Sequence, residues 1–172
     1  YRYLQPNYSG TMQGQYLPDD KLEHKRRSSY SMSHSQNFGY GFSGALSLNG
    51  ASDDTFFTDL ANGSSVIAQT NLLRQGTLSY GGGWWSATAN FQQYQTLQPD
   101  SDNPVEAPYK LLPQLTLNAR KPDFHSTDIA FLGQYTHFTR EDQYVGSTFI
   151  DGLTAGRTVL YPQLSLPYVT PG

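Results

Sequence analysis

The sequence predicts an all-β fold, in which about nine strands form an up-and-down, antiparallel segment of a transmembrane β-barrel. Three observations support this class. Apolar and polar residues alternate with period two along most of the chain. Short and long connections alternate between the predicted strands. Charged residues make up only 15% of a chain that is otherwise rich in Ser, Thr, Asn, Gln and Gly, whereas soluble domains contain about 25%.

Most of the predicted strands are longer than the roughly 5 to 6 residues usual in soluble sheets. A tilted strand needs about 9 to 11 residues to cross a bilayer. Strands are expected near Thr11–Pro18, Arg27–Gln36, Tyr40–Gly50, Gln69–Gly81, Trp84–Leu97, Lys110–Lys121, Thr127–Arg140 and Leu153–Tyr168, with Tyr1–Leu4 as the tail of an earlier strand.

Three of these strands show the alternation most clearly, at Tyr40–Gly50, Trp84–Leu97 and Lys110–Lys121. Successive side chains of a strand point to opposite faces, so one face of each is polar and the other apolar. Leu111 is expected on the apolar face of the third strand. The lipid-facing candidates are Phe42, Leu46, Leu48, Phe91, Leu115 and Leu117; the lumen-facing candidates are Ser43, Ser47, Asn49, Ser86, Thr88, Asn90, Gln92, Gln114, Thr116 and Asn118.

The connections have the asymmetry of outer-membrane barrels, which have short periplasmic turns and longer outer loops. Aromatic residues near strand ends, including Tyr16, Tyr80, Trp84, Trp85 and Tyr168, are typical of the girdles at the two membrane interfaces. Short turns are expected at Gln5–Gly10, Asn37–Gly39, Gly82–Gly83 and Pro122–Ser126, and long loops at Asp19–Arg26, Ala51–Ala68, Gln98–Tyr109 and Glu141–Gly152.

Composition excludes several classes of function. The formal net charge is −3, so no overall basic field favours nucleic acid as a partner. The chain has no cysteine, which removes disulfides and thiolate metal sites. No apolar run approaches the roughly 18 residues of a membrane-spanning helix. Because the strand pattern runs into both ends, residues 1–172 are interpreted as one partial outer-membrane barrel domain, an open segment of a larger barrel.

The sequence contains few candidates for catalytic, metal-binding or ligand-binding residues. The spacing of the four histidines fits no metal site, no Ser/His or Asp/His set lies near a strand end, and neither an enzyme nor a cofactor is predicted. The one basic cluster, Lys25, Arg26 and Arg27, lies in a predicted outer loop, where charge-assisted hydrogen bonds favour lipopolysaccharide phosphates as ligands. Arg74, Arg120 and Arg157 are candidates for lining the lumen.

An ordered set of segments resembles the barrel domain of the LptD family, the Gram-negative outer-membrane lipopolysaccharide-assembly proteins, also called organic solvent tolerance proteins (OstA). The segments are Tyr1–Pro6 with Tyr8–Gly10, Gly14–Asp20, Ser52–Asp54 with Phe56–Phe57 and Asp59–Leu60, Leu112–Leu115, His137–Phe138, and Tyr161–Leu164 with Leu166–Pro167.

The resemblance implies that the chain is part of the wall of a translocon that delivers lipopolysaccharide to the outer leaflet. It also implies contact with the bilayer, with an LptE-like lipoprotein plug in the lumen, and with periplasmic transport components. The family's periplasmic jellyroll and its first and last barrel strands do not match this stretch, so the lateral gate is not expected on these residues. Three alternatives stay open: another large barrel of porin or autotransporter type, an outer-membrane enzyme, and a soluble all-β binding module.

Overall fold

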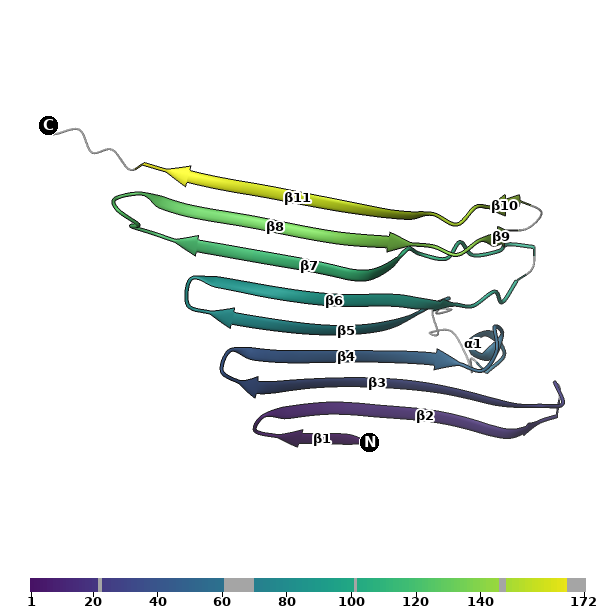
Figure 1. Cartoon of the computed structure of the whole chain (residues 1–172). Helices are drawn as coiled ribbons and strands as arrows, with labels where there is room; N and C mark the ends of the chain where they lie inside the picture. Colours follow the sequence, from purple (N-terminus) through teal and green to yellow (C-terminus); the bar gives the residue numbers. More distant parts are fainter. Residues whose placement is uncertain (22, 61–69, 101, 146–147, 167–172) are drawn as a thin grey trace, which may run out of the picture.

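The computed structural model describes residues 1–172 except 22, 61–69, 101, 146–147 and 167–172. Its main element is one nine-stranded antiparallel sheet, in which the strands lie side by side in chain order (Figure 1). The prediction of an up-and-down meander is confirmed. The strands are β1 (Arg2–Gln5), β2 (Tyr8–Asp20), β3 (Lys25–Gly39), β4 (Phe42–Ala51), β5 (Asn71–Gly82), β6 (Trp85–Thr96), β7 (Lys110–Lys121), β8 (Asp128–Thr139) and β11 (Thr154–Ser165).

Two small elements occur in the long connections. The β4–β5 connection contains a single helical turn, α1 (Phe56–Asp59), and the β8–β11 connection contains a hairpin of β9 (Gln143–Val145) and β10 (Thr148–Ile150). The prediction of Glu141–Gly152 as a plain loop was therefore wrong. No helix in the described part of the chain is long and apolar enough to cross a membrane.

Several predicted bounds were too short or displaced. β2 and β3 extend further than expected at both ends, so the first turn is only Pro6–Asn7. Trp84 lies in the β5–β6 turn rather than in a strand. The start of the strand predicted at Gln69 and the end of the one predicted to reach Tyr168 lie outside the described residues.

The short turns advance regularly across the sheet. The pair closest to the β1–β2 turn is Gln5 with Tyr8, and it is in register with Gly44 of β4. Gly44 lies two residues from Phe42, where β4 leaves the β3–β4 turn. The same advance of two residues separates each later turn from the one before it. Two residues span about 6.7 Å and two strand spacings about 9.6 Å, which gives a tilt of about 35°. Strands of outer-membrane barrels are tilted by about 35–45°.

Aromatic rings lie over glycines on one face of the sheet. A Cβ atom added at Gly50 would come within 2.5 Å of the Tyr30 ring, and one at Gly133 within 2.9 Å of the Phe131 ring. The rings therefore occupy the space that side chains would fill, which compensates for the lost packing at a glycine within a strand. A larger residue at either position would therefore displace the neighbouring aromatic ring.

The sheet is a single layer, and its two edges, β1 and β11, are not paired with each other. Only Phe56, Leu72 and Leu97 form a buried apolar core among the described residues. Many large apolar side chains are exposed, including Leu78, Phe91, Leu115 and Leu160. A soluble protein seldom exposes so extensive an apolar surface. The surface is therefore suited to an apolar environment beyond the chain.

Candidate functional site

The candidate site is the polar face of the sheet. Residues that are paired across an antiparallel ladder point to the same side, so the register shows which side chains share a face. Ser43 pairs with Ser79, which pairs with Thr88, and Thr88 with Thr116. Through such pairs the register places all ten lumen-facing candidates on one face: Ser43, Ser47, Asn49, Ser86, Thr88, Asn90, Gln92, Gln114, Thr116 and Asn118.

Hydroxyl and amide groups on this face bond to one another across the strands. The Ser31 hydroxyl donates to Asn49 Oδ1 at 2.8 Å, and Asn49 Nδ2 donates to the Leu73 carbonyl at 2.7 Å. Further along the sheet, Gln75 Nε2 donates to Asn90 Oδ1 at 2.8 Å. These neutral bonds satisfy polar side chains without any charged partner. The face can hold water or a polar protein surface without presenting a ring of charges.

The opposite face is apolar. Phe42 pairs with Tyr80, Leu46 with Gly76, and Gly76 with Phe91. The Tyr80 ring lies 4.7 Å from that of Phe42 and 4.5 Å from that of Trp85, centroid to centroid, close to the turns. All six lipid-facing candidates share this face: Phe42, Leu46, Leu48, Phe91, Leu115 and Leu117.

Two residues lie on the face opposite to the one expected. Leu111 pairs with Gln92 and Phe138, so it belongs to the polar face. The register shifts between Leu111 and Gln114, around Pro113, because proline has no N–H to donate to the ladder. Arg74 pairs with Leu48 on the apolar face, where its Nε donates to the Asn49 carbonyl at 3.0 Å near the long-loop end of β5.

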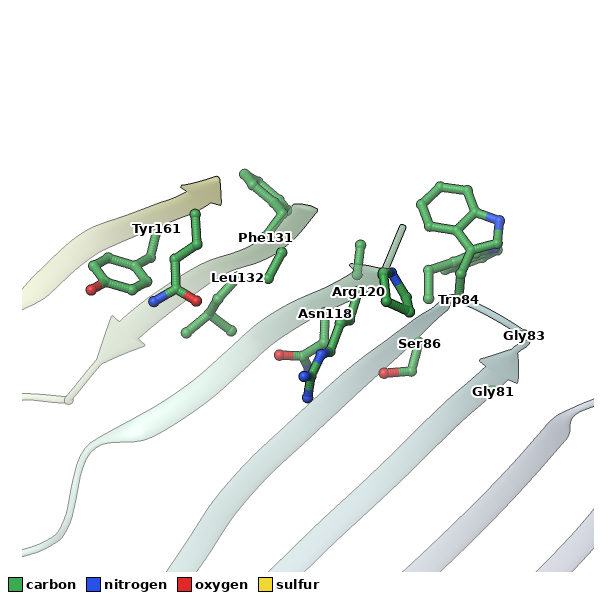
Figure 2. Close-up of a pocket in the computed structure, with 15 residues that line it drawn as sticks. Gly81, Gly83, Trp84, Ser86, Asn118, Arg120, Phe131, Leu132 and Tyr161 are labelled. Atoms are coloured by element: carbon green, nitrogen blue, oxygen red, sulfur yellow. The ribbon is translucent and has the colours of Figure 1, made fainter. Parts of the chain in front are cut away.

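Near the turns, residues of β5, β6, β7, β8 and β11 line a hollow. Figure 2 shows Ser86, Asn118, Arg120 and Leu132 on one side of these strands, whereas Phe131 and Trp84 point to the other side. Arg120 and Arg157 both belong to the polar face by register. Leu132, Val159 and Tyr161 share this face, so it becomes more apolar toward β11.

The basic cluster does not act as one unit. Arg27 is 1% exposed and is bonded to the carboxylates of Asp20, Asp53 and Asp59. A buried guanidinium already satisfied by carboxylates has no donor left for a lipopolysaccharide phosphate, so the structure does not support that role for Arg27. Lys25 lies 3.2 Å from a Glu23 carboxylate oxygen. Arg26 is exposed.

The carboxylates around Arg27 are the feature that sequence reasoning missed. Burial alone would raise the pKa of Asp53, but hydrogen bonds from Arg27 and Ser52 outweigh it and hold that pKa below its ordinary value. The partners come from the end of β2 and from two points around α1. No local sequence pattern links the end of β2 to the segment around α1. The acidic residues of these two segments, in a chain with one basic cluster, were the signal that could have predicted ion pairs with that cluster.

The remaining titratable groups show no ligand geometry. In the part of the chain that the structure describes, no three His, Asp or Glu side chains are arranged to hold a metal ion. His34 Nδ1 lies 2.6 Å from the Tyr3 hydroxyl on the apolar face, and Asp100 accepts from Asn103 within its own turn. The Asn103 bond, followed by one from the Asp102 backbone, lowers the pKa of Asp100.

A single-layer, tilted, antiparallel meander with one polar and one apolar face has the architecture of a wall segment of a large β-barrel. The family model described as LPS transport system D (LptD) matches residues 25–172. The chain therefore belongs to the LptD family.

Similar proteins align with nearly the whole chain. LPS-assembly protein LptD of Azoarcus sp. strain BH72 is 40% identical over 99% of the chain, and that of Aromatoleum aromaticum is 42% identical over 100%. LPS-assembly protein LptD of Nitrosomonas europaea is 37% identical over 97% of the chain. The chain covers 20 to 22% of these relatives, so it corresponds to about a fifth of their length.

Proposed function

We propose that this chain is part of the wall of a bacterial outer-membrane barrel that delivers lipopolysaccharide to the outer leaflet, and that it has no catalytic role. The observation that carries the proposal is the two-faced, single-layer sheet in a chain of the LptD family. The test is depletion of the parent protein in cells. Lipopolysaccharide should then stop reaching the cell surface, and the parent gene should restore it; unchanged surface lipopolysaccharide would overturn the proposal.

In this arrangement the apolar face contacts lipid and the polar face lines the lumen. Backbone groups within a bilayer must be bonded internally, which strands achieve by pairing with their neighbours. The edge strands β1 and β11 would then pair with further strands of the parent barrel. An LptE-like lipoprotein in the lumen would contact the neutral side chains of the polar face, and periplasmic transport components would act at the short-turn side.

The orientation of the two faces can be tested at two neighbouring positions of β4. In the parent protein, a fluorescent label on Leu46→Cys should be strongly quenched by brominated lipid, because Leu46 lies on the apolar face. The same label on Ser47→Cys should be quenched little, because Ser47 lies on the opposite face. Equal quenching at both positions would contradict the assignment.

Of the three basic residues, Arg26 is the best placed to contact lipopolysaccharide phosphates. It is exposed, and by alternation along β3 it lies on the side opposite to Arg27, which shares the polar face with Ser29 and Ser31. Arg26→Gln should reduce the lipopolysaccharide that copurifies with the parent protein several-fold, since a charge-assisted bond is lost. Lys21→Gln, in the neighbouring loop, is the matched control. No difference between the two variants would remove Arg26 from the proposal.

A further inference from the structure

Two cations and an amide lie in a row at the long-loop end of the apolar face, on the neighbouring strands β5, β6 and β7 (Figure 1). Arg74 of β5 pairs with Gln93 of β6. Leu111 of β7 pairs with Gln92, so Lys110, one residue earlier in the antiparallel ladder, lies beside Gln93 and on its side of the sheet. We call Arg74, Gln93 and Lys110 the rim row. Two strand spacings, about 9.6 Å, separate the backbones of its two cations.

The rim row lies at the depth where a lipid-facing surface would meet the headgroups. Arg74 is eight residues from Gly82, whose pair is the last before the β5–β6 turn. At about 3.3 Å per residue and a tilt of about 35°, Arg74 is about 22 Å from the turn end of a lipid-facing band about 25 Å tall. One row closer to the turns the face is apolar, with Leu46, Gly76 and Phe91. The rim row therefore borders an apolar surface.

The guanidinium of Arg74 is held in place but not neutralised. Its Nε donates to the Asn49 carbonyl at 3.0 Å, and its Nη2 donates to Gln95 Oε1 at 2.7 Å. Gln95 is itself anchored, because its Nε2 donates to the Ala51 carbonyl at 2.7 Å. Within the described residues, Nη1 of Arg74 has no hydrogen bond and no carboxylate forms an ion pair with Arg74. None of the residues outside the description is Asp or Glu, so this chain supplies Arg74 with no acidic side chain.

The other two members of the rim row also have donors to offer. Gln93 is exposed, and its amide makes no bond to the part of the chain that the structure describes. Lys110 is paired with Glu141, whose side chain is mostly exposed. That bond uses only one of the three N–H groups of the ammonium. The row thus presents N–H donors on three adjacent strands, with the amide between the two cations.

A cation without a counter-charge beside hydrocarbon is unfavourable, because the guanidinium or ammonium loses its hydration. Arginine and lysine relieve this by laying their apolar stems along lipid while the charged end reaches the headgroup level. The anion available at that level is a lipid phosphate, which accepts short, charge-assisted hydrogen bonds from both side chains. The unpaired Nη1 of Arg74 is suited to such a bond.

We propose that Arg74, Gln93 and Lys110 bind a phosphate group of an outer-leaflet lipid, with lipopolysaccharide as its source, on the outward surface of the barrel wall. This inference rests on the proposed function, because it requires the apolar face to contact lipid. The acyl chains of the bound lipid lie along Leu46 and Phe91. Arg74 is the principal ligand, since it has a rigid, planar fork of donors and no acidic partner.

The test uses the full-length parent protein in phosphatidylcholine nanodiscs, with the fluorescent label on Leu46→Cys, one row from Arg74. Brominated phosphatidic acid should quench this label at about a tenfold lower mole fraction than phosphatidylcholine with the same brominated chains, since its phosphate is not neutralised by choline. Arg74→Gln should abolish this preference. Arg157→Gln, which removes a cation from the polar face, should leave the preference unchanged.

Gln93→Glu is a second variant that removes no recorded bond. It places a carboxylate beside Arg74 and should also abolish the preference, whereas Gln92→Glu, on the opposite face, should not. This pair decides the question even if Arg74→Gln does not fold. Unbrominated lipopolysaccharide should displace the brominated phosphatidic acid and restore the fluorescence, and inorganic phosphate should not.

Three outcomes would overturn the inference: equal quenching by the two brominated lipids, a preference that survives Gln93→Glu or folded Arg74→Gln, or no displacement by lipopolysaccharide. Discs made wholly of brominated phosphatidylcholine report lipid contact at Leu46 regardless of the headgroup. Strong quenching there without a phosphate preference would remove the rim row as a site and leave the barrel wall standing. Absence of quenching in these discs would contradict the barrel wall itself.

Discussion

Replacing Arg27 with Leu in the parent protein should reduce the stability of the folded barrel by roughly 3 kcal/mol. The substitution leaves the carboxylates of Asp20 and Asp53, which are mostly buried, without their cation. An uncompensated buried charge costs about 3 to 5 kcal/mol, and the exposure of Asp59 places the expected loss at the lower end. The measurement is the urea concentration at which purified protein loses the compact gel mobility of the folded state.

Two further variants complete this experiment. Arg27→Lys keeps the charge but not the planar, five-donor fork of the guanidinium, so it should lose roughly half as much stability as Arg27→Leu. Lys110→Gln removes the cation of a pair whose partner, Glu141, has an 82% exposed side chain. Such surface pairs contribute about 0 to 1 kcal/mol, and this variant should unfold close to wild type. If Arg27→Leu were as stable as Lys110→Gln, the cluster would not stabilise the fold.

The Arg27 cluster also shows where prediction from sequence reaches its limit. Alternation is a local property, so it predicted β7 at Lys110–Lys121 with its observed bounds. It also separated residues such as Leu117 and Thr116 onto the faces that the register gives them. The bonds of Arg27, in contrast, span 7 to 32 residues along the chain. Contacts of this kind depend on how the loops fold back on the sheet, which residue periodicity does not encode.

Errors within the strands have a different origin. Leu111 was assigned to the apolar face by extending the alternation through Pro113, but the register shift there reverses the face. Arg74 was a candidate for lining the lumen, although it has the same parity along β5 as Leu78 and Tyr80, which lie on the apolar face. Parity along β5 places Arg74 on the correct face. Residue type would have placed both Arg74 and Leu111 on the wrong face. A proline within a strand indicates that the alternation of faces can change there, so the faces of the residues beyond it must be assigned separately.

The small hairpin was missed although its sequence contained a signal. Tyr144 and Val145 precede a Gly-Ser dipeptide, and Thr148, Phe149 and Ile150 follow it. Aromatic and β-branched residues on either side of such a dipeptide are typical of a hairpin. The surrounding polar residues of the predicted loop obscured a pattern only three residues long on each side. Short elements of this length carry too few alternations for periodicity alone to identify them.

The largest effect on assembly is expected from Leu117→Arg. Leu117 lies on the apolar face, where its register partners are Ala87 and Gly133. It is four residues from the last pair before the β7–β8 turn, Lys121 with Ile129. At about 3.3 Å per residue and a tilt of about 35°, this places it about 11 Å from the turn end of a lipid-facing band about 25 Å tall. Leu117 therefore lies near the middle of the membrane in the proposed orientation.

Arginine at the midplane of a barrel's lipid face costs about 2 to 4 kcal/mol, enough to lower the folded fraction of a marginally stable barrel many-fold. The matched control is Thr116→Arg, one residue away on the polar face, where Thr116 pairs with Thr88 and Gln134. A charge there meets polar side chains and water, so the amount of folded protein in outer membranes should change little. Equal amounts of folded Leu117→Arg and Thr116→Arg protein would contradict a lipid-facing role for the apolar face, because only lipid distinguishes the two positions so strongly.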